Sequence, residues 1–83
     1  MKVPYFSIYD EKAQLFGQVF PAPTPGAAER SLKESMSNPD SPHGKYPEDY
    51  ALYRVFDFDD EQGTIIDTYE PPQLVVRASA LSA

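Results

Sequence analysis

The chain has 83 residues, a formal net charge of −6 and no cysteine. This length allows one domain, residues 1–83, with a small core, and the lack of cysteine excludes disulfides and zinc sites built on thiolates. The excess of acidic residues works against non-specific binding to nucleic acid, in which clustered Lys and Arg replace the counterions of phosphates.

Residues 3–20 are predicted to form an antiparallel hairpin. Val3–Tyr9 follows the strand period, with Phe6 and Ile8 on one face and the tyrosines on the other. A short polar break separates this strand from a second one, Gln14–Phe20. Strands joined so closely are expected to pair with each other.

Residues 25–37 are predicted to form the main helix. Thr24 suits the capping position, and Pro25 suits the first helical position. Apolar residues at a spacing of four give one thin stripe, formed by Ala28, Leu32 and Met36. Asn38–Pro39 is expected to end the helix.

Residues 38–49 are predicted to be a loop that closes with one helical turn at Pro47–Asp49. Ser41, His43 and Asp49 supply the residue types of a catalytic triad, but no nucleophile elbow accompanies them. The single histidine has no second histidine or cysteine with which to form a metal site, so we expect an exposed loop histidine. The glycines are too scattered to cradle a phosphate. We therefore expect no enzyme, no metal and no cofactor.

Residues 50–69 are predicted to form a second hairpin. Tyr50–Phe58 has the strongest strand signal in the chain. Thr64–Tyr69 is expected to pair back across an acidic loop that Gly63 closes.

A tail, residues 70–83, follows the second hairpin. Glu70–Pro72 is expected to break the strand. The apolar segment Gln73–Leu81 is expected to form either a short fifth strand, which we favour for Leu74–Arg77, or a docked helical turn. The order β-β-α-β-β predicts an α+β fold of two layers, in which one helix covers a four-stranded antiparallel sheet. The second face of this sheet would be open or used in association.

The aromatic side chains are the best candidates for a binding site. Sheet modules bind single-stranded nucleic acid by stacking bases on exposed rings that Arg or Lys flank. Tyr5, Tyr9 and Tyr53 are predicted to form such a face, with Lys45 and Arg54 on the phosphates. In the alternative, these rings are core or dimer contacts, and the charge of −6 favours that alternative.

The loop of the second hairpin is strongly acidic and contains Asp57, Asp59, Asp60 and Glu61. It begins like a calcium-binding loop, but Gln62 and Thr68 stand where that pattern needs glycine and glutamate. We therefore predict a solvated hairpin tip that discourages edge-to-edge aggregation. Its four carboxylates are also candidate contacts for a protein partner.

Several short motifs together resemble a known family. They are Tyr5-Phe6-Ser7-Ile8-Tyr9-Asp10, Phe20-x-Ala22-x-Thr24, Pro47-Glu48-Asp49-Tyr50-x-Leu52-Tyr53 and Phe58-Asp59-Asp60-x-x-Gly63. In this order, over residues 3–77, they resemble the small nonstructural protein of gokushoviruses, tailless single-stranded DNA phages of the microvirus group. The resemblance implies a non-virion protein that acts in the switch from duplex replication to synthesis and packaging of single-stranded genomes. Proteins of that family are often described as DNA-binding, so the resemblance also implies DNA binding. It implies no catalytic residues.

Charge and resemblance together leave three hypotheses for function. The first is an acidic adaptor that docks on basic surfaces of phage or host replication or packaging proteins. The second is weak, direct binding of single-stranded DNA through the sheet aromatics and Arg or Lys. The third is an inhibitor of a host DNA-binding protein that mimics DNA by its acidity.

The expected setting is the cytoplasm of the host bacterium. Apolar runs are too short to cross a membrane, and Met1–Pro4 lacks the apolar core of a signal peptide. A thin core in so small a domain also favours a homo-oligomer, with a dimer as the first expectation.

Overall fold

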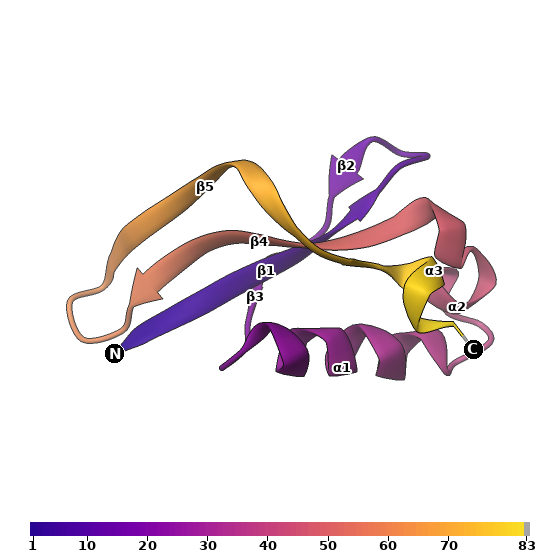
Figure 1. Ribbon diagram of the computed structural model, residues 1–83, viewed down its shortest axis with the longest axis horizontal. Helices are drawn as coiled ribbons and strands as arrows, with labels where there is room; N and C mark the ends of the chain where they lie inside the picture. The colour runs from indigo at the N-terminus through magenta and orange to yellow at the C-terminus, as the bar shows by residue number, and fades with distance from the viewer. Residues whose placement is uncertain (83) are drawn as a thin grey trace.

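The computed structural model describes residues 1–82, which form an antiparallel sheet with one main helix on one of its faces (Figure 1). The strands are β1 (Lys2–Asp10), β2 (Leu15–Phe16), β3 (Phe20–Pro21), β4 (Tyr50–Asp59) and β5 (Thr64–Arg77). The helices are α1 (Pro25–Met36), α2 (Pro42–Lys45), the 3₁₀ turn η1 (Pro47–Asp49) and α3 (Ala78–Leu81).

The predicted α+β class is confirmed, with one main helix and an antiparallel sheet. The short helix α2 was not predicted from the sequence, whereas α3 lies in the tail segment for which a docked helical turn was the alternative to a strand. Residue 83, the last of the predicted tail, lies outside the described residues. None of the helices in residues 1–82 has the length and apolar character needed to cross a membrane.

Strands β1 and β4 lie side by side in the middle of the sheet. The strand order is β2-β1-β4-β5, and β3 also pairs with β1. β1 and β4 pair along their length, from Lys2 opposite Asp59 to Asp10 opposite Tyr50. One extra residue in β4, Val55, shifts the register between these ends. Such a bulge changes which residues of β4 share a face on either side of it.

The first hairpin differs from the prediction because its second strand is interrupted. Only the two-residue strand β2 pairs with the end of β1, and β3 pairs further back with Tyr5 and Phe6. At the interruption, the N–H of Gly17 donates to the carbonyl oxygen of Ile8 at 2.8 Å, and its own carbonyl accepts from the Ser7 hydroxyl at 2.8 Å. A Cβ at position 17 would lie 3.4 Å from the Ile8 carbonyl oxygen, which is an ordinary van der Waals distance.

The prediction that Glu70–Pro72 would break the strand was wrong. β5 continues through these residues and arches away from β4, as Figure 1 shows. Thr68 pairs with Phe56 before the arch and Gln73 pairs with Arg54 after it, so several residues of β5 face the single Val55. An edge strand tolerates proline because one side of its backbone needs no partner. The predicted fifth strand is therefore the second half of β5.

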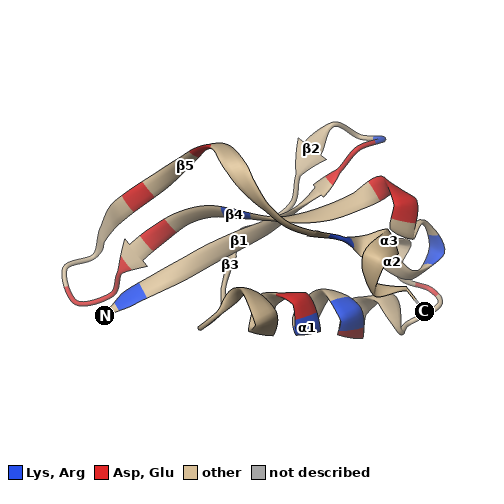
Figure 2. Cartoon of the chain, in the orientation of Figure 1, with Lys and Arg blue, Asp and Glu red and all other residues tan. Residues whose placement is uncertain are grey.

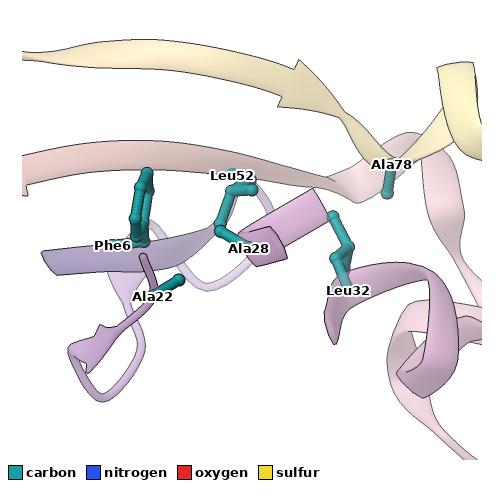
Figure 3. Close-up of a cluster of buried hydrophobic side chains, with 6 residues drawn as sticks. All are labelled: Phe6, Ala22, Ala28, Leu32, Leu52 and Ala78. Atoms are coloured by element: carbon teal, nitrogen blue, oxygen red, sulfur yellow. The ribbon is translucent and has the colours of Figure 1, made fainter. Parts of the chain in front are cut away.

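The core lies between α1 and one face of the sheet (Figure 3). Its buried members are Phe6, Ala22, Ala28, Leu32, Leu52 and Ala78. The Thr24 hydroxyl caps α1 by accepting from the N–H of Ala27 at 3.2 Å, at the predicted start of the helix. Burying a side chain the size of Phe6 contributes roughly 1.5–3 kcal/mol, so the few large core residues carry most of the stability.

Candidate functional site

Six aromatic rings lie on the sheet face opposite to α1. Alternation along β1 places Tyr5 and Tyr9 on the face opposite to the buried Phe6. Directly opposite residues share a face, and Phe16 of β2 is opposite Tyr9 while Phe56 of β4 is opposite Tyr5. We call this surface the open aromatic face, and its rings are Tyr5, Tyr9, Phe16, Tyr53, Phe56 and Phe58.

The rings of the open aromatic face form two groups. In one group the ring centroid of Tyr9 lies 4.7 Å from that of Phe16 and 6.2 Å from that of Tyr53. In the other, Tyr5 stacks on Phe56 with a centroid distance of 4.9 Å, and Phe58 lies 5.9 Å from Tyr5. The structure thus brings Tyr9 and Tyr53 together and places Tyr5 in the second group, about 13 Å away along β1.

Phe16, Phe56 and Phe58 were missed by the sequence prediction. Phe56 and Phe58 alternate with Asp57, and this period of two is a signal from which both rings could have been assigned to one face. The position of Phe16 depends on the short pairing of β2 with β1, for which the sequence carries no comparable signal.

The two cationic residues predicted to flank the aromatic site lie elsewhere. Arg54 is opposite Phe6, so it is on the face that also holds the core. Its Nε and Nη2 atoms donate to Oδ1 of Asp57 at 3.0 and 2.7 Å. Lys45 is exposed in α2, which packs with α1 in the helical layer (Figure 1). The open aromatic face therefore lacks both predicted phosphate contacts.

Asp57 is buried, and its carboxylate is the centre of a polar network. The Tyr69 hydroxyl donates to Oδ2 at 2.6 Å, and Nζ of Lys2 lies 3.4 Å from the same oxygen. Lys2 also lies 3.4 Å from the carboxylate of Asp67, so the network joins β1, β4 and β5. The Arg54 guanidinium lies 5.0 Å from the centroid of the Tyr69 ring, in position for a cation–π contact.

The network keeps Asp57 ionised. Burial alone would raise the pKa of this carboxyl group, but hydrogen bonds from Tyr69 and Arg54, with the positive charge of Arg54, hold the pKa below its ordinary value. The same hydrogen bond raises the pKa of the Tyr69 hydroxyl. Asp57 is thus an internal ion-pair partner, although its sequence position groups it with the exposed acids of the loop.

The acidic hairpin tip consists of Asp59, Asp60 and Glu61. Asp59 is the last residue of β4, and the other two lie in the turn between β4 and β5. Asp60 and Glu61 each accept a hydrogen bond from the Met1 ammonium group at 2.7 Å. Oxygen atoms of the three carboxylates lie within 4.8 Å of one another, and this ammonium group lies beside them. The side chain of Asp60 is 50% exposed and that of Glu61 is 76% exposed. The tip therefore still presents negative charge to a partner.

Backbone N–H groups of the hairpin tip stabilise the ionised form of Asp59. The N–H of Glu61 donates to Oδ1 of Asp59 at 2.9 Å and lowers the pKa of Asp59. A hydrogen bond to the ionised form of a carboxyl group always favours that form. Asp59 is therefore ionised at neutral pH.

His43 is partly buried in α2, so the expectation of an exposed loop histidine was wrong. Its Nδ1 atom lies 2.7 Å from Oγ of Ser35, and its ring meets the edge of Tyr50 at a centroid distance of 4.6 Å. Burial lowers the pKa of His43, which favours a neutral ring at neutral pH. These contacts give His43 a packing role between α1 and the sheet.

Comparison with known proteins identifies the family. A family model described as "Phage ORF5 protein" matches residues 3–81. The chain belongs to the Phage ORF5 protein family. Searches of curated proteins and of solved structures return no match for it.

Membership in the Phage ORF5 family confirms the coarser part of the sequence resemblance, namely that this is a phage protein. In this Phage ORF5 protein, the predicted tyrosines lie on one sheet face, while Arg54 and Lys45 lie away from it. Two surfaces remain as candidates for binding, the uncharged open aromatic face and the acidic hairpin tip.

Proposed function

We propose that this member of the Phage ORF5 family is a non-enzymatic adaptor that binds proteins rather than DNA. Its partners are basic surfaces of phage or host proteins that synthesise or package single-stranded genomes. It meets them in the cytoplasm of the host bacterium and is not part of the virion. The family match and the resemblance to the gokushovirus nonstructural protein support this phage setting.

The distribution of charge is the observation that carries the proposal. Residues 55–76 contain six carboxylates and no Lys, Arg or His. Figure 2 shows acidic positions along β4, β5 and the turn between them. The cations nearest to this hairpin are already paired. The Met1 ammonium group binds Asp60 and Glu61. Arg54 binds Asp57, and Lys2 lies between Asp57 and Asp67. A surface of this kind attracts a basic partner and speeds its association.

Direct binding of single-stranded DNA is the second candidate function, and the cluster of Tyr9, Phe16 and Tyr53 is the observation that favours it. Stacking a base on an aromatic ring contributes about 1–3 kcal/mol. Tight binding also needs cations that displace phosphate counterions. Because Arg54 and Lys45 lie away from these rings, we place this function second.

Titration of a labelled single-stranded oligonucleotide separates the two functions. Non-specific DNA binders reach dissociation constants of about 10⁻⁴–10⁻⁶ M at physiological salt. Because Arg54 and Lys45 do not flank the rings, we expect a dissociation constant for this chain that is weaker than about 0.1 mM even at low salt. Fluorescence anisotropy measures this constant. Tighter binding that weakens as salt is added, and that Tyr53→Ala abolishes, would contradict the adaptor proposal.

A further inference from the structure

The chain keeps most of its aromatic side chains outside its own core. Of its eleven aromatic residues, Phe6 alone is among the buried core residues of the described chain. Four of the seven buried hydrophobic residues are alanine. The open aromatic face holds six rings that a larger core would bury. Contiguous apolar surface of this kind on a small protein marks an interaction site.

We infer that the open aromatic face is a self-association surface, on which a second copy of this chain packs sheet against sheet. Pairing extends the face onto the edge strand, because Ile65 is opposite Phe58 and Leu74 is opposite Tyr53. These two side chains are 55% and 50% exposed, and Phe16 is 44% exposed. The apolar surface therefore runs from β2 across β1 and β4 to β5.

Charge selects a second copy as the occupant. Each copy has a net charge of −6, so contact through a surface that carries little charge keeps the repulsion between two copies low. On β1, β2 and β4 the open aromatic face has no ionised side chain, since Lys2, Arg54 and Asp57 lie on the other face. Arg77, at one end of β5, is already bound to Glu11. A nucleic acid or a basic protein would find no opposite charge here.

The size of the face is compatible with a dimer. An aromatic side chain contributes about 150–250 Å² when fully buried. Each of the six residues is still partly accessible to solvent. Together with the exposed parts of Ile65 and Leu74, the face offers on the order of 500 Å² per copy. This is near the lower end for specific interfaces, so we expect a dimer that dissociates in the micromolar range.

Sedimentation equilibrium of the full chain, from about 5 to about 500 μM, tests the inference. We expect the average mass to rise from that of a monomer to that of a dimer within this range. Leu74→Lys should raise the dissociation constant about tenfold or more, because the new charge would have to be buried in the interface. Leu74 is half exposed, so this variant should still fold, and thermal unfolding followed by circular dichroism verifies that it does.

Leu15→Lys is the matched control. Leu15 is 66% exposed in β2, but it is opposite Asp10 and so lies on the other face of the sheet. It should leave the dissociation constant unchanged. A chain that stays monomeric at about 500 μM would overturn the inference. Equal effects of the two lysine variants, or dissociation of the dimer by a thymidine oligonucleotide, would do the same. The inference is independent of the adaptor proposal, which rests on the acidic hairpin tip.

Discussion

Phe6→Ala is expected to lower the free energy of unfolding by about 3–5 kcal/mol, the usual cost of truncating a buried phenylalanine. Phe6 is fully buried between α1 and the sheet, where its ring also meets Phe20 at a centroid distance of 6.2 Å. A domain of this size is expected to have a total stability of only about 4–12 kcal/mol. The variant should therefore be largely unfolded in moderate urea, and circular dichroism during a urea titration measures the loss.

Phe16→Ala is the matched control for this prediction. It removes the same atoms from a ring that is 44% exposed on the opposite face of the sheet. Measured at low concentration, where the chain is monomeric, it should cost only about 1 kcal/mol, from the lost contacts with Tyr9 and Tyr53. Equal losses for the two variants would contradict the conclusion that only one sheet face belongs to the core.

Asp57→Asn is expected to lower the free energy of unfolding by about 3 kcal/mol at neutral pH. The change leaves Arg54 facing a neutral amide and weakens the hydrogen bond from Tyr69, which holds the arch of β5 against β4. We take the lower end of the range for breaking a buried ion pair, because the side chains of Arg54 and Lys2 are themselves 21% and 52% exposed. Urea titration measures the loss.

The pH dependence of this difference provides an independent test. The pKa of Asp57 in the folded state lies below its ordinary value of 3.8, so the ionised network stabilises the folded state fully above about pH 4. The stabilisation is lost as the pH falls through the folded-state pKa. The difference in stability between wild type and Asp57→Asn should therefore shrink in acid.

Asp67→Asn is the control for the network, because Asp67 also contacts Lys2 but is 53% exposed. It should cost less than about 1 kcal/mol, as is usual for an exposed ion pair. A cost equal to that of Asp57→Asn would refute the central place of Asp57. So would a difference between Asp57→Asn and wild type that does not change with pH.

Local signals in the sequence predicted the elements that depend on neighbouring residues. Thr24 and Pro25 define the start of α1, and the structure shows the predicted cap. Alternation along β1 correctly separated Phe6 from the tyrosines onto two faces, and the structure shows that the face of Phe6 is the core side. The start of α2 also has a local signal, because Ser41 caps it just before Pro42, although this segment was predicted to be a loop.

Features that depend on pairing between distant strands could not be predicted. The bulge at Val55 puts Arg54 and Asp57 on the same face of the sheet. In a regular strand, residues three positions apart lie on opposite faces. This bulge turned two predicted surface residues into an internal ion pair. Pro71 and Pro72 were expected to end the strand, but they lie in β5 at the free edge of the sheet, where proline is tolerated. The position of a strand at the edge is a property of the assembled sheet and has no local signal in the sequence.

The adaptor proposal is tested most directly by capture of partners from bacteria infected with the phage that encodes the chain. Tagged wild type is compared with Asp60→Asn combined with Glu61→Gln at the hairpin tip, and with Glu34→Gln combined with Glu48→Gln as a control of equal charge change. After nuclease treatment, we expect wild type and the control to retain a replication or packaging protein and the tip variant to lose most of it. Recovery that nuclease abolishes, or that the tip variant leaves unchanged, would contradict the proposal that this chain acts by binding a protein through its acidic tip.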